Sequence, residues 1–147
     1  MTEAAGIKIM RVFEAPIERV WREWTEPSCF ADWFGGPTAS VPMESVTMDV
    51  RVGGGWSLTM LFGDRSIDWH GAYQEVVEPS RLVFTVTDQP PGANYAIVTV
   101  DLRDLGDGRT EMAFEQRGGD LTPEQYKAAG AGWGKFFDHI DDRLASG

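Results

Sequence analysis

Residues 122–144 read TPEQYKAAGAGWGKFFDHIDDRL, and this stretch decides the fold. Thr122 and Gln125 have the spacing of a capping box, and Pro123 between them suits the first turn of a helix. The apolar residues that follow recur at the spacing of one helix face: Tyr126, Ala129, Trp133, Phe136, Phe137, Ile140 and Leu144. We therefore predict a long C-terminal helix whose apolar face lies on a sheet.

Three glycines, Gly130, Gly132 and Gly134, interrupt this helix. Each costs up to about 1 kcal/mol relative to alanine in a helix interior. Gly130 falls on the apolar face, where the missing side chain either lets the sheet approach closely or leaves space beneath the helix. Close packing is the favoured interpretation, and the alternative of a cavity stays open.

The region before this helix, residues 41–116, predicts about six strands separated by turns rich in glycine and proline. Alternate residues are apolar in each segment, as in the run Trp56, Leu58, Met60 and Phe62. The connections are short, and parallel neighbours would need crossovers of a dozen residues or more. We therefore predict an antiparallel meander with one apolar face.

The N-terminal part predicts one further strand and two short helices. Residues 7–14 are β-branched and apolar without clean alternation, which predicts a strand covered on both faces. Pro16 and Pro27 each precede apolar residues at helical spacing, and Trp21 and Trp24 lie on one face of the first helix. The sequence thus predicts an α+β domain over residues 1–147, with about seven strands in all.

Composition limits the classes of partner. No run approaches the roughly 18 apolar residues of a membrane span, and the first six residues do not resemble a signal peptide, so we expect a cytoplasmic protein without membrane association. Cys29 is the single cysteine, which excludes an intrachain disulfide and a multi-cysteine metal cluster. The net charge of −10 repels nucleic acid phosphates, so nucleic acid is not expected as a partner.

Six segments carry a family resemblance: RVFEAP (11–16), VWREWTEP (20–27), WFG (33–35), DVRVGG (49–54), YQEVVEPSRLVFT (73–85) and Gly132-Trp133. They resemble the branch of the START/helix-grip (SRPBCC) superfamily that contains the homologues of the activator of heat-shock-protein-90 ATPase. The resemblance implies a curved antiparallel sheet wrapped around the long C-terminal helix. It also implies a hydrophobic cavity between them, which in this superfamily takes lipids and other apolar small molecules.

We therefore expect the chain to bind an apolar small molecule. We expect nine residues to line the cavity that the resemblance implies: Trp33, Trp56, Met60, Trp69, Tyr73, Glu75, Phe84, Trp133 and Phe137. Two alternatives stay open: an enzyme such as a cyclase, dehydratase or hydrolase in the same cavity, and a stress-related or co-chaperone-like protein-interaction domain. A homodimer through an edge strand or through the helix with Trp21 and Trp24 also stays open.

The strongly diagnostic catalytic motifs are absent from the sequence: HExxH, CxxC, the phosphate-binding GxxxxGK[ST] loop and the GxSxG elbow. We therefore assign no catalytic residue, metal ligand or cofactor. Asp138, His139, Asp141 and Asp142 lie close together on the final helix and could touch a cation, but a solvated polar face is the favoured interpretation.

The segment around Tyr73 leaves two interpretations open. Alternation sends Trp69, Gly71, Tyr73 and Glu75 to one side and His70 to the other. In the cavity, Tyr73 and Glu75 could position a polar ligand atom, and Arg51 or Arg81 could neutralise a ligand carboxylate. A buried carboxylate there could also do acid–base work, and the enzyme alternative would use Tyr73, Glu75, His70 or an arginine. The favoured alternative is an ion pair between Glu75 and Arg81 that fixes the turn at Pro79.

Overall fold

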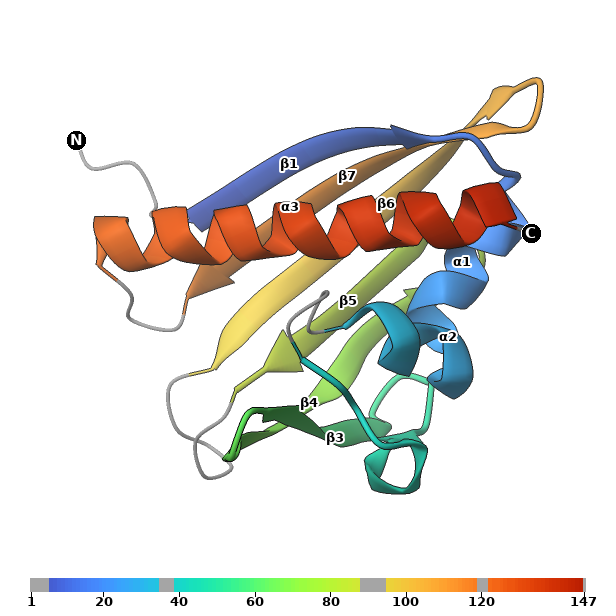
Figure 1. The fold of residues 1–147 in the computed structure, drawn as a ribbon. Coiled ribbons are helices and arrows are strands. Elements are labelled where there is room, and N and C mark those ends of the chain that lie inside the picture. The colour runs from blue at the N-terminus through green and yellow to red at the C-terminus, as the bar shows by residue number, and fades with distance from the viewer. Residues whose placement is uncertain (1–5, 35–38, 88–94, 119–121, 147) are drawn as a thin grey trace.

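The computed structural model describes residues 6–34, 39–87, 95–118 and 122–146. It contains a curved antiparallel sheet with a long helix across one face and two short helices at one end of it (Figure 1). The elements in chain order are β1 (Gly6–Phe13), α1 (Ile17–Thr25), α2 (Pro27–Trp33), the 3₁₀ helix η2 (Met43–Ser45), β2 (Thr47–Met48), β3 (Gly55–Phe62), β4 (Arg65–Val77), β5 (Arg81–Val86), β6 (Ala96–Gly106), β7 (Arg109–Gly118) and α3 (Pro123–Ser146). This is the predicted helix-grip architecture.

The strands form one sheet in the order β1-β7-β6-β5-β4-β3-β2, with every neighbouring pair antiparallel. The order follows the chain from β2 to β7, because short turns join successive strands. The exception is β1, which pairs with β7 from Gly6 opposite Arg117 to Phe13 opposite Thr110. The first and last strands therefore lie side by side, with α3 passing over them (Figure 1).

The predicted alternation is confirmed in β3, β6 and β7, and in β5 apart from Val83, which is also buried. The inner face carries buried side chains at every second position: Trp56, Leu58, Met60, Leu82, Phe84, Val86, Val98, Val100, Leu102, Met112 and Phe114. The core lies between this face and the helices. α1 and α2 contribute Val20, Trp24, Phe30 and Trp33 to it, each at most 2% exposed.

The predicted start of α3 is also confirmed. The backbone N–H of Thr122 donates to Oε1 of Gln125 over 2.8 Å, and the backbone N–H of Gln125 donates to Oγ1 of Thr122 over 3.1 Å. These two bonds satisfy donors that a helix N-terminus would otherwise leave unpaired. In the part of the chain that the structure describes, no helix is long and apolar enough to cross a bilayer.

Ion pairs and a close approach hold α3 against β1. Nη1 of Arg11 lies 2.8 Å from Oδ1 of Asp138 and 3.2 Å from Oδ2 of Asp141. A Cβ added at Gly130 would lie 3.6 Å from Cγ2 of Ile7, which is an ordinary contact distance. Ile7 of β1 therefore lies directly beneath Gly130, which leaves room for a methyl group but not for a cavity, and close packing does not require glycine at this position.

The prediction that the first strand is covered on both faces is wrong. β1 is an edge strand, and Met10 and Val12 on its outer face are 64% and 42% exposed. α3 covers only the inner face, where Ile7 and Phe13 are buried. A run of apolar residues without alternation therefore did not distinguish a central strand from an edge strand here.

Candidate functional site

The space between the sheet and α3 is the first candidate site, and it brings most of the predicted ligand-binding residues together. Seven of the nine are buried in one hydrophobic cluster: Trp33, Trp56, Met60, Tyr73, Phe84, Trp133 and Phe137. Trp69 is partly buried and packs against the same cluster. Burial is the main reason that the pKa of the Tyr73 hydroxyl is raised above its usual value, so this phenol stays protonated.

Phe34, at the C-terminal end of α2, lies at the centre of this space. Its ring centroid is 6.3 Å from that of Trp56 and 6.4 Å from that of Trp69, both on the sheet. On the side of α3, the centroids of Trp133 and Phe136 lie at 6.0 and 5.5 Å. The Phe34 ring therefore bridges the two walls.

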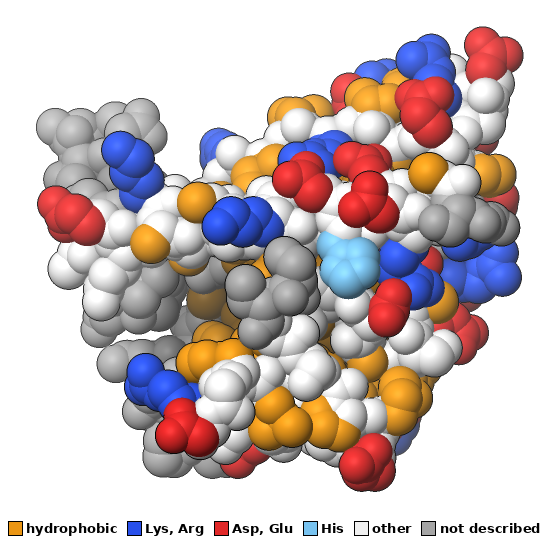
Figure 2. Space-filling model, in the orientation of Figure 1, with side chains coloured by type: hydrophobic (Ala, Val, Ile, Leu, Met, Phe, Trp, Pro, Cys, Tyr) orange, Lys and Arg blue, Asp and Glu red, His pale blue; other side chains and the backbone are white. Residues whose placement is uncertain are grey.

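Figure 2 shows a hollow below the N-terminal half of α3, with hydrophobic side chains visible inside it. Trp133 stands on this half of the helix and donates from Nε1 to Oε1 of Gln116 on β7 over 2.7 Å. The buried Gln116 amide thus supplies a polar point on an otherwise apolar wall.

The tryptophan N–H groups of the cluster differ in their partners. Nε1 of Trp33 donates to the backbone carbonyl of Glu23 over 2.7 Å, and Nε1 of Trp56 donates to that of Thr85 over 2.9 Å. Nε1 of Trp24 and Nε1 of Trp69 are buried and have no acceptor among the described residues. Buried indole N–H groups usually find a partner, so these two are notable.

Glu75 does not lie with the other predicted residues. A β-bulge between Tyr73 and Glu75 shifts the register: Tyr73 faces Phe84 of β5, but Glu75 faces Val83. The extra residue reverses the alternation, so the prediction that Glu75 shares the side of Tyr73 is wrong. Its side chain is 50% exposed on the outer face, and Oε1 lies 3.2 Å from Nε of Arg81. This is the ion pair expected under the favoured alternative.

The other polar residues considered for the cavity are also dispersed. Arg81 forms a second ion pair with Asp101 at 2.8 Å, and Arg51 is 74% exposed and pairs with Asp49 at 2.9 Å. His70 lies on the face of β4 opposite to Tyr73 and bridges to Thr87 through the backbone. Tyr73 is thus the one member of that set on the inner face.

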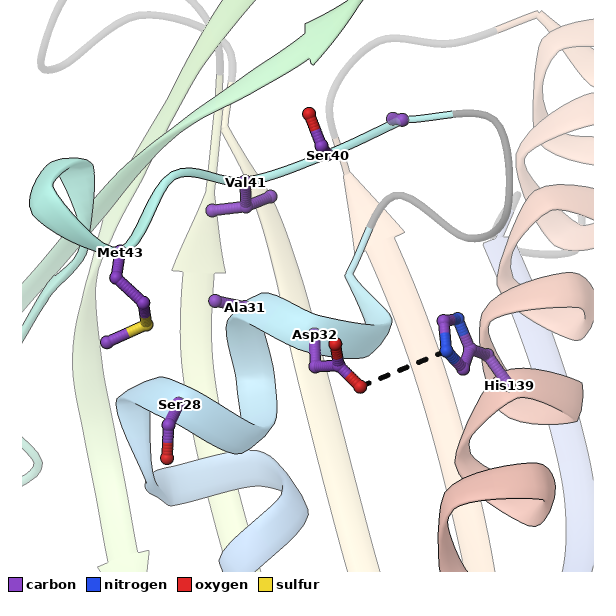
Figure 3. A pocket seen from close by; sticks show the side chains of 8 residues that line it. Ser28, Ala31, Asp32, Ser40, Val41, Met43 and His139 are labelled. Carbon is purple, nitrogen blue, oxygen red and sulfur yellow. Dashed lines mark ion pairs between the residues drawn. The ribbon is translucent and has the colours of Figure 1, made fainter.

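A second candidate site is an open pocket of about 390 Å³ between α2, the segment 39–43 and α3. Its lining is mixed: Ser28, Ala31, Asp32, Ala39, Ser40, Val41, Met43 and His139. Nε2 of His139 lies 4.0 Å from Oδ2 of Asp32 (Figure 3). Figure 3 shows the hydroxyls of Ser28 and Ser40 pointing away from His139, so among the described lining residues neither serine contacts the histidine as a nucleophile would contact its base.

The carboxylate of Asp32 belongs to an ion network that joins the three helices. Arg143 on α3 bonds to Asp32 on α2 through Nη1, and Nε of the same side chain lies 2.6 Å from Oε1 of Glu23 on α1. Glu23 has no exposed surface. The bond to Glu23 is the first cause that raises the pKa of Arg143. Burial, and then the charge of Glu23, raise the pKa of the nearby Cys29 thiol.

Sequence reasoning missed four residues of these two regions. Phe34 lies in the segment WFG (33–35) but was not among the predicted ligand-binding residues. Gln116 follows Met112 and Phe114 at a spacing of two, so a polar residue at an inward position was the available signal. Glu23 falls three residues after Val20 on the apolar side of α1, which was a similar signal. Its partner Arg143 is 120 residues away and had no local signal.

Metal binding has no support from the described residues, because no group of three or more His, Cys, Asp or Glu side chains is placed to hold an ion. Asp138 and Asp141, which were considered for a cation, pair instead with Arg11.

Comparison with known proteins gives a consistent family relationship. The model of the family described as "Activator of Hsp90 ATPase homolog 1-like protein" matches residues 14–145. The chain is similar to the crystal structure of protein CV1439 from Chromobacterium violaceum, with 26% identity over 95% of this chain and 96% of that one and a TM-score of 0.82. It is also similar to the AHSA1-like protein from Aeromonas hydrophila, with 25% identity over 97% and 93% of the two chains and a TM-score of 0.79. No curated protein sequence matches the chain.

Proposed function

The chain belongs to the family of activator of Hsp90 ATPase homolog 1-like proteins, and on this premise we propose that it binds a small hydrophobic or aromatic molecule between the inner face of the sheet and α3. The helix-grip fold of this family generally holds hydrophobic ligands. The family relationship does not identify the ligand or its physiological role, because one fold can serve many functions.

One observation carries the proposal. Aromatic rings from two walls, Trp56 and Trp69 on the sheet and Trp133 and Phe136 on α3, gather around Phe34. Figure 2 shows that the surface is hollowed below the N-terminal half of α3. Such a site is apolar with few polar points, which is the usual composition of a small-molecule pocket. Rings offer large contact areas and favour flat ligands.

The direct test is native mass spectrometry of freshly purified protein, compared with the same protein after denaturation and solvent extraction. A reproducible additional mass that is released on denaturation would support the proposal and identify the ligand class. Empty protein would then be titrated with the neutral fluorescent dye Nile red. Protein that carries no bound molecule and does not enhance Nile red emission would contradict the proposal.

A matched pair of variants locates the binding. Trp69→Ala removes a ring of the sheet wall and should weaken Nile red binding by about 3-fold to 10-fold, since an aromatic contact contributes roughly 0.5–1.5 kcal/mol beyond buried area. Val77→Ala removes an apolar side chain of the same strand that is 52% exposed, and it should leave the affinity unchanged. Equal affinities of the two variants would place the dye elsewhere.

A further inference from the structure

The position of Phe34 indicates the size of the group that the site accepts. The ring of Phe34 lies between the sheet wall and the α3 wall, in contact with Trp69 on one side and with Trp133 on the other. Phe34 is 4% exposed, so the protein fills its own site with one phenyl ring. A ligand that enters between the same walls must replace this ring, and the best replacement has a similar shape and size.

Trp69 indicates the polar group of the ligand. It lies opposite Leu58 in the β3–β4 pair, and Leu58 is 2% exposed on the inner face, so Trp69 also projects inward. Its Nε1 is buried without an acceptor among the described residues. Among the same residues, the aromatic ring in contact with Trp69 is that of Phe34. A group that replaces Phe34 therefore lies against the indole ring that carries this unpaired donor. A ligand oxygen that accepts this hydrogen bond would remove the cost of leaving the donor unpaired.

Charge indicates that this oxygen belongs to a neutral group. The partly buried arginines near α3 and α1 are already paired: Arg11 with Asp138 and Asp141, Arg143 with Glu23 and Asp32, and Arg19 with Glu23. A carboxylate ligand buried between the two walls would therefore find none of these arginines unpaired, which is costly.

We propose that the ligand is a neutral aromatic carbonyl compound, whose ring replaces that of Phe34 and whose carbonyl oxygen accepts a hydrogen bond from Nε1 of Trp69. This rests on the proposed function and adds a ligand class to it. Trp24 has a similar unpaired N–H, but its ring is 1% exposed and lies deeper among aromatic rings of the sheet and α3, so we assign the ligand to Trp69.

Three probes with one phenyl ring each separate the parts of the proposal: acetophenone carries the carbonyl, ethylbenzene lacks it and benzoate carries a charge. Dissociation constants are measured by NMR titration of the full chain. Acetophenone should bind about 5-fold to 10-fold more tightly than ethylbenzene, and benzoate should bind least. Trp69→Phe should reduce acetophenone to the level of ethylbenzene, whereas the control Trp21→Phe on α1 should preserve the difference.

Phe34→Ala tests the replacement of the ring. It should tighten the binding of acetophenone and ethylbenzene alike, because the ligand no longer has to displace a side chain. Weaker binding of both probes would show that Phe34 is part of the wall and would overturn this part of the proposal. The Trp69→Phe comparison is repeated in the Phe34→Ala background, and circular dichroism checks that each variant is folded.

The outcomes also separate this inference from the proposed function. Equal affinities for acetophenone and ethylbenzene, no effect of Trp69→Phe, or tightest binding of benzoate would overturn the neutral carbonyl ligand while aromatic binding stands. Failure of all three probes to bind to either the wild type or Phe34→Ala would overturn this inference, whereas the proposed function would fall only if the protein also carried no bound molecule and did not enhance Nile red emission.

Discussion

Replacing Arg143 with methionine should strongly destabilise the protein, because the change leaves a buried carboxylate without its main partner. Glu23 has no exposed surface and receives Nε of Arg143 at 2.6 Å, with Nη2 at 3.4 Å from its second oxygen. After the substitution, the nearest remaining cation is Arg19, whose Nε lies 4.0 Å from Oε2 of Glu23. Methionine keeps the length and the apolar packing of the side chain, so the loss of charge is the dominant change.

The magnitude follows from the burial of Glu23. Breaking a buried ion pair by removing one partner costs about 3–5 kcal/mol, from a total stability of about 5–15 kcal/mol. For a chain of this size, the melting temperature should fall by about 6–20 °C. Urea unfolding followed by tryptophan fluorescence measures the free energy, and the six tryptophans give a large signal.

Two further variants serve as controls. Asp32→Asn removes the other partner of Arg143, but its side chain is 54% exposed, so the cost should be about 1 kcal/mol or less. The double variant Glu23→Met/Arg143→Met removes both charges and should recover most of the stability lost in Arg143→Met. A loss below about 1 kcal/mol in Arg143→Met, or a double variant that is no more stable than that single variant, would refute this reasoning.

The remaining predictions concern glycines and the cysteine. Gly71→Ala should lower the free energy of unfolding by about 1–3 kcal/mol or more, because the new Cβ would lie far inside the van der Waals contact distance of the Thr85 backbone oxygen. An unchanged melting temperature would contradict this close approach of the two backbones. Gly132→Ala and Gly134→Ala should each raise stability by about 0.5–1 kcal/mol in the same assay, because a Cβ at either position meets no atom within 4 Å and alanine favours a helix. The alkylation rate of Cys29 by iodoacetamide should reach its midpoint at a higher pH than that of free cysteine, since only the thiolate reacts and the pKa of this thiol is raised. A midpoint at or below that of free cysteine would show that burial and Glu23 do not control the thiol.

The parts of the fold that sequence reasoning predicted are those with local signals. The capping box of Thr122 and Gln125 lies within four residues, and its two hydrogen bonds are present. The alternation of Trp56, Leu58 and Met60 needs only a period of two, and all three side chains are buried. Prolines and glycines marked the breaks between elements, and the order of elements then restricted the topology.

The parts that could not be predicted depend on pairing between distant residues. Glu75 turned outward because a bulge in the β4–β5 pair adds one residue to the alternation, and nothing local to β4 specifies it. β1 became an edge strand because β7 pairs with it on one side only. The space between the sheet and α3 is filled by the ring of Phe34. A pattern of apolar positions does not specify how such a ring packs.

The pairing of β1 with β7 also has a consequence for the assembly of the fold during synthesis. β1 can pair with β7 only when residues as distant as Arg117 have left the ribosome. The ion pair of Glu23 forms later still, because Arg143 is 120 residues further along the chain. Such a topology has a high contact order, so folding is expected to be slow and to finish only with the last helix. Until then the nascent chain exposes Trp24, Trp33 and the apolar side of β1. Exposed apolar surfaces of this kind promote aggregation and are bound by chaperones.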